Sequence, residues 1–171
     1  MNEPSRGRPV VPDGHGVPDS DAGILEWSAV EDRLRVSLHC WLATTRPNGK
    51  PHVVPCGGVW LERRFWYDGA PDTVHVNNLN SDPSCVLHLE DGRQAVIVEG
   101  RSEAAAPPGI DFGDRLSGAM SAKYGDHGYA PGPGSWDGPD SGGLRVLTPV
   151  KAMAWLDFPT DMTRFRFPPR P

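Results

Sequence analysis

The sequence predicts a mainly β fold, a closed or split antiparallel β-barrel with short flanking helices. Short segments that alternate between apolar and polar residues follow one another along the chain, which is typical of half-buried strands. Turn residues such as Pro47-Asn48-Gly49-Lys50 and Asp91-Gly92-Arg93 separate these segments. Helical spacing of apolar residues appears only in a few short stretches.

The segment 39–46 is the clearest strand, with Cys40, Leu42 and Thr44 on one face and the intervening residues on the other. Because Pro55 cannot donate to a ladder and Gly57-Gly58 favours a bulge or a close approach, the returning strand is expected to be irregular. The remaining strands are expected over residues 51–61, 65–67, 84–90, 94–103, 144–147, 152–158 and 162–167.

Three helices are expected. The first, over 24–35, is amphipathic and packs onto the barrel, and another covers 110–124. A short helix begins after Thr73, which is a good N-cap residue, and connects two strands.

The domain organisation follows from where Pro and Gly gather. Residues 1–22 lack a periodic apolar pattern and are expected to form a flexible N-terminal arm. Residues 23–167 form the barrel domain, interrupted by a long loop over 124–143 in which Tyr129 and Trp136 favour docking on the surface. Residues 168–171 form a tail.

The composition excludes several function classes. A net charge of −5 and a pI near 5.6 argue against nucleic-acid binding. No apolar run approaches the roughly 18 residues that cross a bilayer, and the N-terminus has no apolar core typical of a secretory signal. The three cysteines form no CxxC pair and are expected to be buried thiols in a reducing compartment, so we expect a cytoplasmic protein.

Candidate catalytic and metal-binding residues are few. His39, His52, His75 and His88 are spread over four elements without a ligand spacing, so no metal site is expected. Nucleophile elbows and phosphate-binding loops are absent from the sequence. The start of the helix after Thr73 is the remaining candidate, because exposed amides at the positive end of a helix dipole bind phosphate. On the residues alone, a helix that only connects two halves of the barrel is favoured over a ligand site.

The chain resembles the pyridoxamine 5'-phosphate oxidase-like proteins, and within them the flavin/deazaflavin oxidoreductases. The resemblance begins with the hairpin Trp41-Leu42-Ala43-Thr44-Thr45-Arg46-Pro47-Asn48-Gly49-Lys50-Pro51-His52-Val53-Val54-Pro55. It continues over about residues 25 to 167 through Gly58-Val59-Trp60, Asn78-Leu79-Asn80-Ser81-Asp82-Pro83, Val86-Leu87-His88-Leu89-Glu90, Val96-Ile97-Val98-Glu99-Gly100, Ala122-Lys123-Tyr124-Gly125, Ala154-Trp155 and Thr163-Arg164-Phe165-Arg166-Phe167.

The resemblance implies a split antiparallel β-barrel that forms a homodimer and binds FMN or a deazaflavin coenzyme between subunits. The cofactor ring would lie along Val53, Val54, Pro55 and Cys56, and its phosphate near Thr73, His75, Asn77 and Asn78. The tryptophans also favour a dimer, because five of them are many for a monomer of this size: Trp27, Trp60, Trp66, Trp136 and Trp155.

The chain departs from the family at the phosphate site. Relatives carry Ser/Thr, then Arg-Lys, a spacer, Arg, Asn and Leu, whereas this chain has Val74 and His75 in place of the Arg-Lys pair and Asn77 in place of the later Arg. Charge-assisted contacts to phosphate are about twice as strong as neutral ones. A protonated His75 would restore only part of the lost charge.

Two functions follow as hypotheses. The first is a deazaflavin- or FMN-dependent oxidoreductase that transfers a hydride to or from a small organic substrate. The deazaflavin coenzyme (F-420 type) is favoured, because the branch that the chain resembles uses it and because Lys50 or Arg164 can hold its extended tail. His52 and Tyr124 are weak candidates for a proton donor. The second is a non-redox ligand-binding protein, or a cofactor-free enzyme, on the same barrel.

Overall fold

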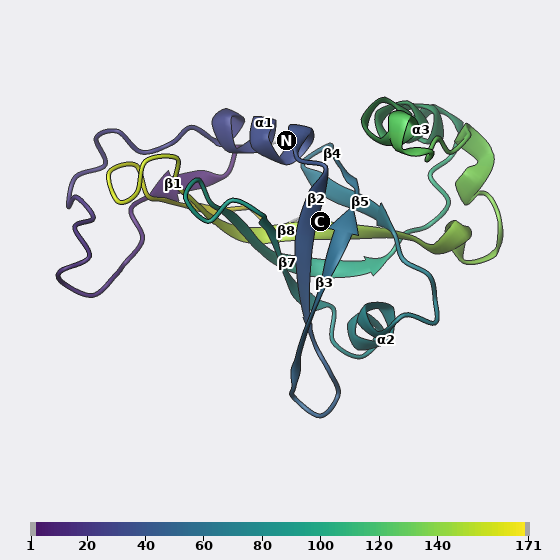
Figure 1. The fold of residues 1–171 in the computed structure, drawn as a ribbon, viewed down its shortest axis with the longest axis horizontal. Coiled ribbons are helices and arrows are strands. Elements are labelled where there is room, and N and C mark those ends of the chain that lie inside the picture. Colours follow the sequence, from purple (N-terminus) through teal and green to yellow (C-terminus); the bar gives the residue numbers. More distant parts are fainter. Residues whose placement is uncertain (1–2, 170–171) are drawn as a thin grey trace.

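A computed structural model describes residues 3–169, which form an antiparallel sheet of nine strands and three α-helices over that range (Figure 1). The strands are β1 (Ser5–Gly7), β2 (His39–Thr45), β3 (Pro51–Gly57), β4 (Val59–Leu61), β5 (Arg64–Asp68), β6 (Ser84–Leu89), β7 (Val96–Ala104), β8 (Leu144–Ala154) and β9 (Thr163–Arg166). The α-helices are α1 (Trp27–Val36), α2 (Val74–Ser81) and α3 (Ile110–Tyr124), and 3-10 turns follow at Gly125–His127, Pro133–Trp136 and Pro139–Gly143.

The sheet is a split barrel, as predicted. Its strand order is β1-β9-β8-β7-β6-β2-β3, and β5 adds β4 to the first half of β8. Among the described residues β3 has a ladder partner only in β2, so β3 is an edge strand beside the split. None of the described helices has the length and hydropathy needed to cross a bilayer.

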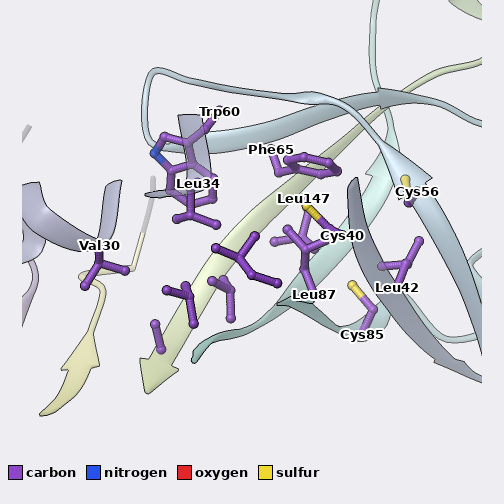
Figure 2. Close-up of a cluster of buried hydrophobic side chains, with 14 of the residues drawn as sticks. Val30, Leu34, Cys40, Leu42, Cys56, Trp60, Phe65, Cys85, Leu87 and Leu147 are labelled. Atoms are coloured by element: carbon purple, nitrogen blue, oxygen red, sulfur yellow. The ribbon is translucent and has the colours of Figure 1, made fainter. Parts of the chain in front are cut away.

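The core fills the barrel because alternate residues of each strand point inward. In β2 the inward residues Cys40, Leu42 and Thr44 are buried, as the alternation predicted. Figure 2 shows Cys40, Cys56 and Cys85 among the apolar side chains of this core. All three are free thiols, and burial raises the pKa of Cys40 to about 11 and of Cys56 and Cys85 to about 12, so they stay protonated.

A second cluster joins α3 to the sheet. Leu116 and Met120 of α3 are buried against Trp66 of β5 and against Trp136 from the long loop. Trp136 is 1% exposed and its Nε1 donates to Asp68 Oδ1 at 2.9 Å. The loop over 124–143 is therefore docked on the barrel, which confirms the expectation from its aromatic residues.

The structure corrects two expected segments. Part of the supposedly flexible arm 1–22 is ordered: β1 pairs with β9, and the Arg8 guanidinium donates to four carbonyls at 2.7–3.1 Å. The strands expected at 144–147 and 152–158 are one strand, β8, because Gly100 opposite Pro149 lies at a bulge that accommodates the proline. Met1, Asn2 and the last two residues of the predicted tail 168–171 lie outside the described residues.

The chain changes direction at Gly58, between β3 and β4. The Gly58 N–H donates to Tyr124 Oη at 2.7 Å, and the Tyr124 hydroxyl lies 2.6 Å from the Leu38 carbonyl oxygen. The predicted close approach at Gly57-Gly58 is confirmed, because a Cβ on Gly58 would lie 2.5 Å from Phe65 Cζ and from the Trp66 carbonyl oxygen.

We expect Gly58→Ala to lower the free energy of unfolding by about 2 kcal/mol or more, because overpacking against fixed backbone displaces the chain. Gly118→Ala on the exposed side of α3 is the matched control, since its Cβ would meet nothing within 4 Å; it should stabilise by up to about 1 kcal/mol. Urea unfolding measures both, and equal effects of the two substitutions would contradict this assignment.

Candidate functional site

The candidate site lies where α2 packs beside the β2–β3 hairpin, which projects from the sheet in Figure 1. Asn78, which is buried, fixes this packing: its Nδ2 donates to Thr44 Oγ1 at 2.9 Å. Thr44 lies directly opposite His52 in the hairpin, so both side chains share the face that α2 covers. Asn78 was predicted to bind the cofactor, and the structure uses it to hold the helix.

Thr73 occupies the N-cap of α2, as predicted, but does not cap it with its side chain. The hydroxyl donates backwards to the Ala70 carbonyl at 2.8 Å, and no cap hydrogen bond reaches the first turn. The first-turn amides therefore receive no acceptor from their N-cap residue, and the positive end of the helix dipole lacks that neutralising contact. Asn77, one turn on, is exposed.

His75 is not the cation that a phosphate site would need. Its pKa is lowered, first by burial and then by the positive charge of Arg145. At neutral pH the ring is consequently uncharged. Arg145 is 4% exposed and donates to Asn80 Oδ1 and to the Ser102 carbonyl, both at 3.3 Å, so it holds α2 from beneath.

The hairpin brings donors to the helix instead. An Arg46 guanidinium nitrogen lies 3.2 Å from His52 Nδ1, and because guanidinium can only donate, Nδ1 is the acceptor. The proton of this ring is then on Nε2, a buried atom with no hydrogen-bond partner among the described residues. Arg46 and His52 thus give this part of the site a positive charge and a spare N–H.

The residues predicted to line the cofactor ring alternate along β3. Val53 and Pro55 point outward and are exposed, while Val54 packs against the core and Cys56 is buried. Only the outward pair offers side-chain surface to a ligand along this edge. The side chains of Val54 and Cys56 face the core, so these two residues leave only backbone groups at this edge.

Two predicted cations are far apart in the fold. Lys50 is exposed in the turn of the β2–β3 hairpin, next to the candidate site. Arg164 lies on β9, separated from β3 by β8, β7, β6 and β2, so the structure does not bring it to this site.

Tyr124, a weak candidate for proton transfer, lies elsewhere and acts structurally. Its hydroxyl is bound to the backbone of Gly58 and Leu38, and burial raises its pKa to about 12. The described residues contain no group of three or more His, Cys, Asp or Glu side chains placed to hold a metal ion.

Sequence reasoning missed Arg46 and Arg145. Arg46 and His52 flank the predicted turn, so pairing the hairpin would have placed them close together. Arg145 had no such signal, because a single basic residue in a strand pattern is normally expected at the surface.

Comparisons with known proteins agree with this fold. The family described as "Pyridoxamine 5'-phosphate oxidase" matches residues 27–152. Among curated proteins no match was found.

Three solved structures with a similar fold show how varied the described functions of such proteins are. An F420 reductase is 20% identical with a TM-score of 0.53, over 83% of this chain and 98% of its own. A heme binding protein from Mycobacterium smegmatis is 19% identical with a TM-score of 0.57, over 88% and 59%. A conserved hypothetical protein from Mycobacterium tuberculosis is 19% identical with a TM-score of 0.55, over 88% and 94%.

The structural matches show a shared fold at low identity, and the family match covers most of the sequence, from α1 into β8. Together with the split barrel they establish the assignment: the chain belongs to the pyridoxamine 5'-phosphate oxidase family.

Proposed function

We propose that this protein is an oxidoreductase that uses a deazaflavin coenzyme, or FMN, to transfer a hydride to or from a small organic substrate. One observation carries the proposal: a positive charge and an unpaired buried donor, Arg46 and His52, lie at the helix that begins beside the edge strand β3. This arrangement complements an anionic group attached to a flat ring.

The charge of the site favours the deazaflavin. A phosphate monoester such as that of FMN carries close to two charges at neutral pH, whereas the phosphodiester of a deazaflavin coenzyme carries one. The start of α2 holds Asp72, Thr73, Val74 and an uncharged His75, so it offers amides but no cation. Arg46 and His52 suit a single charge, and Lys50 in the nearby turn suits a longer anionic tail.

The bound cofactor would supply the hydride chemistry, and the protein would supply position and polarity. Val53 and Pro55 would present an apolar surface to the ring. The unpaired edge of β3 would offer its backbone groups as hydrogen-bond partners. His52 would donate its Nε2–H to the anionic group, and Arg46 would keep that proton on Nε2. No described residue of this site needs to act as an acid or base.

A non-redox ligand-binding function is the second candidate. The absence of a cation in the described first turn of α2 favours it, since relatives of the resembled branch carry several there. A similar structure is named a heme binding protein, so heme is the ligand to test first. A heme titration followed by Soret absorbance distinguishes this candidate, because saturable heme binding without deazaflavin or FMN binding would replace the redox proposal.

The first prediction concerns Arg46. The deazaflavin coenzyme should bind with micromolar affinity when its fluorescence is followed, and Arg46→Ala should weaken binding by about 10- to 100-fold, because a charge-assisted contact is lost. Arg93→Ala removes the same charge from an exposed turn outside the site and should leave affinity unchanged. Failure of both deazaflavin and FMN to bind at millimolar concentration would refute the proposal.

The second prediction concerns His75. Because its pKa is lowered below the ordinary value of about 6.5, the His75 ring is uncharged above neutral pH, and its titration should not change wild-type affinity between about pH 7 and 8. His75→Lys adds a charge at the helix start and should tighten cofactor binding by about tenfold, whereas His75→Gln should not. If neither substitution alters affinity, the anionic group binds away from α2.

We also propose a homodimer, on different grounds from the tryptophan count. Trp27, Trp60, Trp66 and Trp136 are buried within the chain and so do not call for a partner. The outer face of the β2–β3 hairpin does call for a partner. Trp41 is 36% exposed and Val53 is 49% exposed, and Ala43, Pro55 and Val86 lie beside them in the ladder. A second copy would cover this apolar face and close the groove along β3.

Trp41→Glu should convert the dimer into a monomer, because a carboxylate would be buried without a partner. Light scattering after size-exclusion chromatography measures the mass. Val10→Asp, on a side chain that is 93% exposed, is the control and should remain dimeric. A monomeric wild-type protein, or a variant that still dimerises, would contradict the proposed interface.

A further inference from the structure

A pocket lies between α1, α3 and β4. These elements are on the other side of the fold from α2 (Figure 1). Its volume is about 570 Å³, which is within the range of small-molecule sites. Leu38, Val59, Trp60 and Ala119 belong to its apolar wall, and Lys123 lines the same space.

Lys123 is the unusual group of this pocket. It is half-buried near the end of α3, and its Nζ donates to the Gly58 carbonyl at 2.9 Å. No carboxylate of the described residues lies within ion-pair distance of it, whereas Arg35, the other basic residue of the lining, is paired with Glu31 and Asp32 at 3.1 and 3.6 Å. The amine is thus fixed in place without a counter-charge.

Burial favours the neutral form of Lys123. It lowers the pKa of the amine, and the thiol of Cys40 opposes this only in part. The face of the Tyr124 ring, 5.6 Å from Nζ, favours the charged amine, but the Tyr124 hydroxyl stays protonated and brings no negative charge to the pocket, because burial raises its pKa to about 12. The guanidinium of Arg35 across the pocket adds no negative charge. A neutral lysine amine is a nucleophile toward carbonyl groups.

The two other lysines of the chain serve as internal references. Lys50 is exposed in the hairpin turn. Lys151 lies on the sheet with its Nζ 2.9 Å from Glu99 Oε2. Lys50 is solvated and Lys151 has a carboxylate partner, so neither shares the environment of Lys123 and both serve as references.

We propose that this pocket binds small apolar aldehydes or ketones and that Lys123 condenses with their carbonyl group. The amine nitrogen forms a bond to the carbonyl carbon. The carbinolamine then loses the former carbonyl oxygen and the two amine protons as water, which leaves an imine between Nζ and the ligand. No electrons are exchanged with a third reagent. The proposal is independent of the cofactor site at α2.

Reductive trapping tests the proposal. The full chain is incubated with hexanal for increasing times, and the imine is reduced with borohydride. Peptide mass spectrometry identifies the alkylated lysines and gives the rate at which each is labelled. We expect Lys123 to be labelled at least about tenfold faster than Lys50 and Lys151, because its amine is neutral to a greater extent and the pocket concentrates the aldehyde. Labelling of Lys123 at or below the rate of Lys50 would overturn the proposal.

Two controls separate binding in the pocket from simple exposure. Ala119→Leu fills the pocket and should slow labelling of Lys123 while leaving Lys50 unchanged, and 1-hexanol should compete at Lys123 alone. Lys123→Arg should remove the fast adduct and no other. If neither Ala119→Leu nor 1-hexanol affects the rate at Lys123, the pocket does not bind the aldehyde and the proposal fails, whether or not the variants alter stability.

Discussion

The turn at Gly58 is the constraint on which the rest of the structure depends. A side chain cannot fit there, and the hydroxyl of Tyr124 satisfies the Gly58 N–H while it also binds the Leu38 carbonyl. This buried contact ends β3, so that β4 can pair with β5 and β3 is left as an edge strand. The carbonyl of Gly58 also accepts a hydrogen bond from Lys123 at the pocket between α1, α3 and β4. One backbone position therefore shapes both sites.

The electrostatics of α2 explain how the chain differs from relatives with cations on this helix. Arg145 under the helix is a buried cation whose Nε has no partner among the described residues. Burial lowers the pKa of the neighbouring His75, and the positive charge of Arg145 lowers it further. A second positive group on the first turn would face the same repulsion. The hairpin offers a less crowded position for the charge, where Arg46 contacts His52.

The strand pattern could be predicted from the sequence where alternation was regular, as in β2, and where a helix had a clear apolar side, as in α3. Prediction from the sequence failed where a tertiary contact overrides the local preference of the residues. A break was expected between residues 147 and 152, but Gly100 opposite Pro149 provides the space that lets β8 continue. β1 has no apolar signal at all, because its pairing with β9 is made by backbone groups.

The position of the site could be predicted from the resemblance, but not its chemistry. Asn78 matched the family and proved to be a packing contact with Thr44. His75 could replace part of the missing charge only if it were protonated, and burial lowers its pKa. Arg145, which is distant in the sequence, lowers that pKa further, and only the folded chain brings it near α2.

An ¹⁵N-edited NMR titration with the deazaflavin coenzyme tests most directly whether the anionic group binds between the hairpin and the helix. The largest amide shifts should fall on Val74–Val76 and on residues 46–52, and the His52 Nε2–H should become visible and shift downfield. Largest shifts in the turns at 91–94 and 155–158, or none that saturate, would contradict the proposed site.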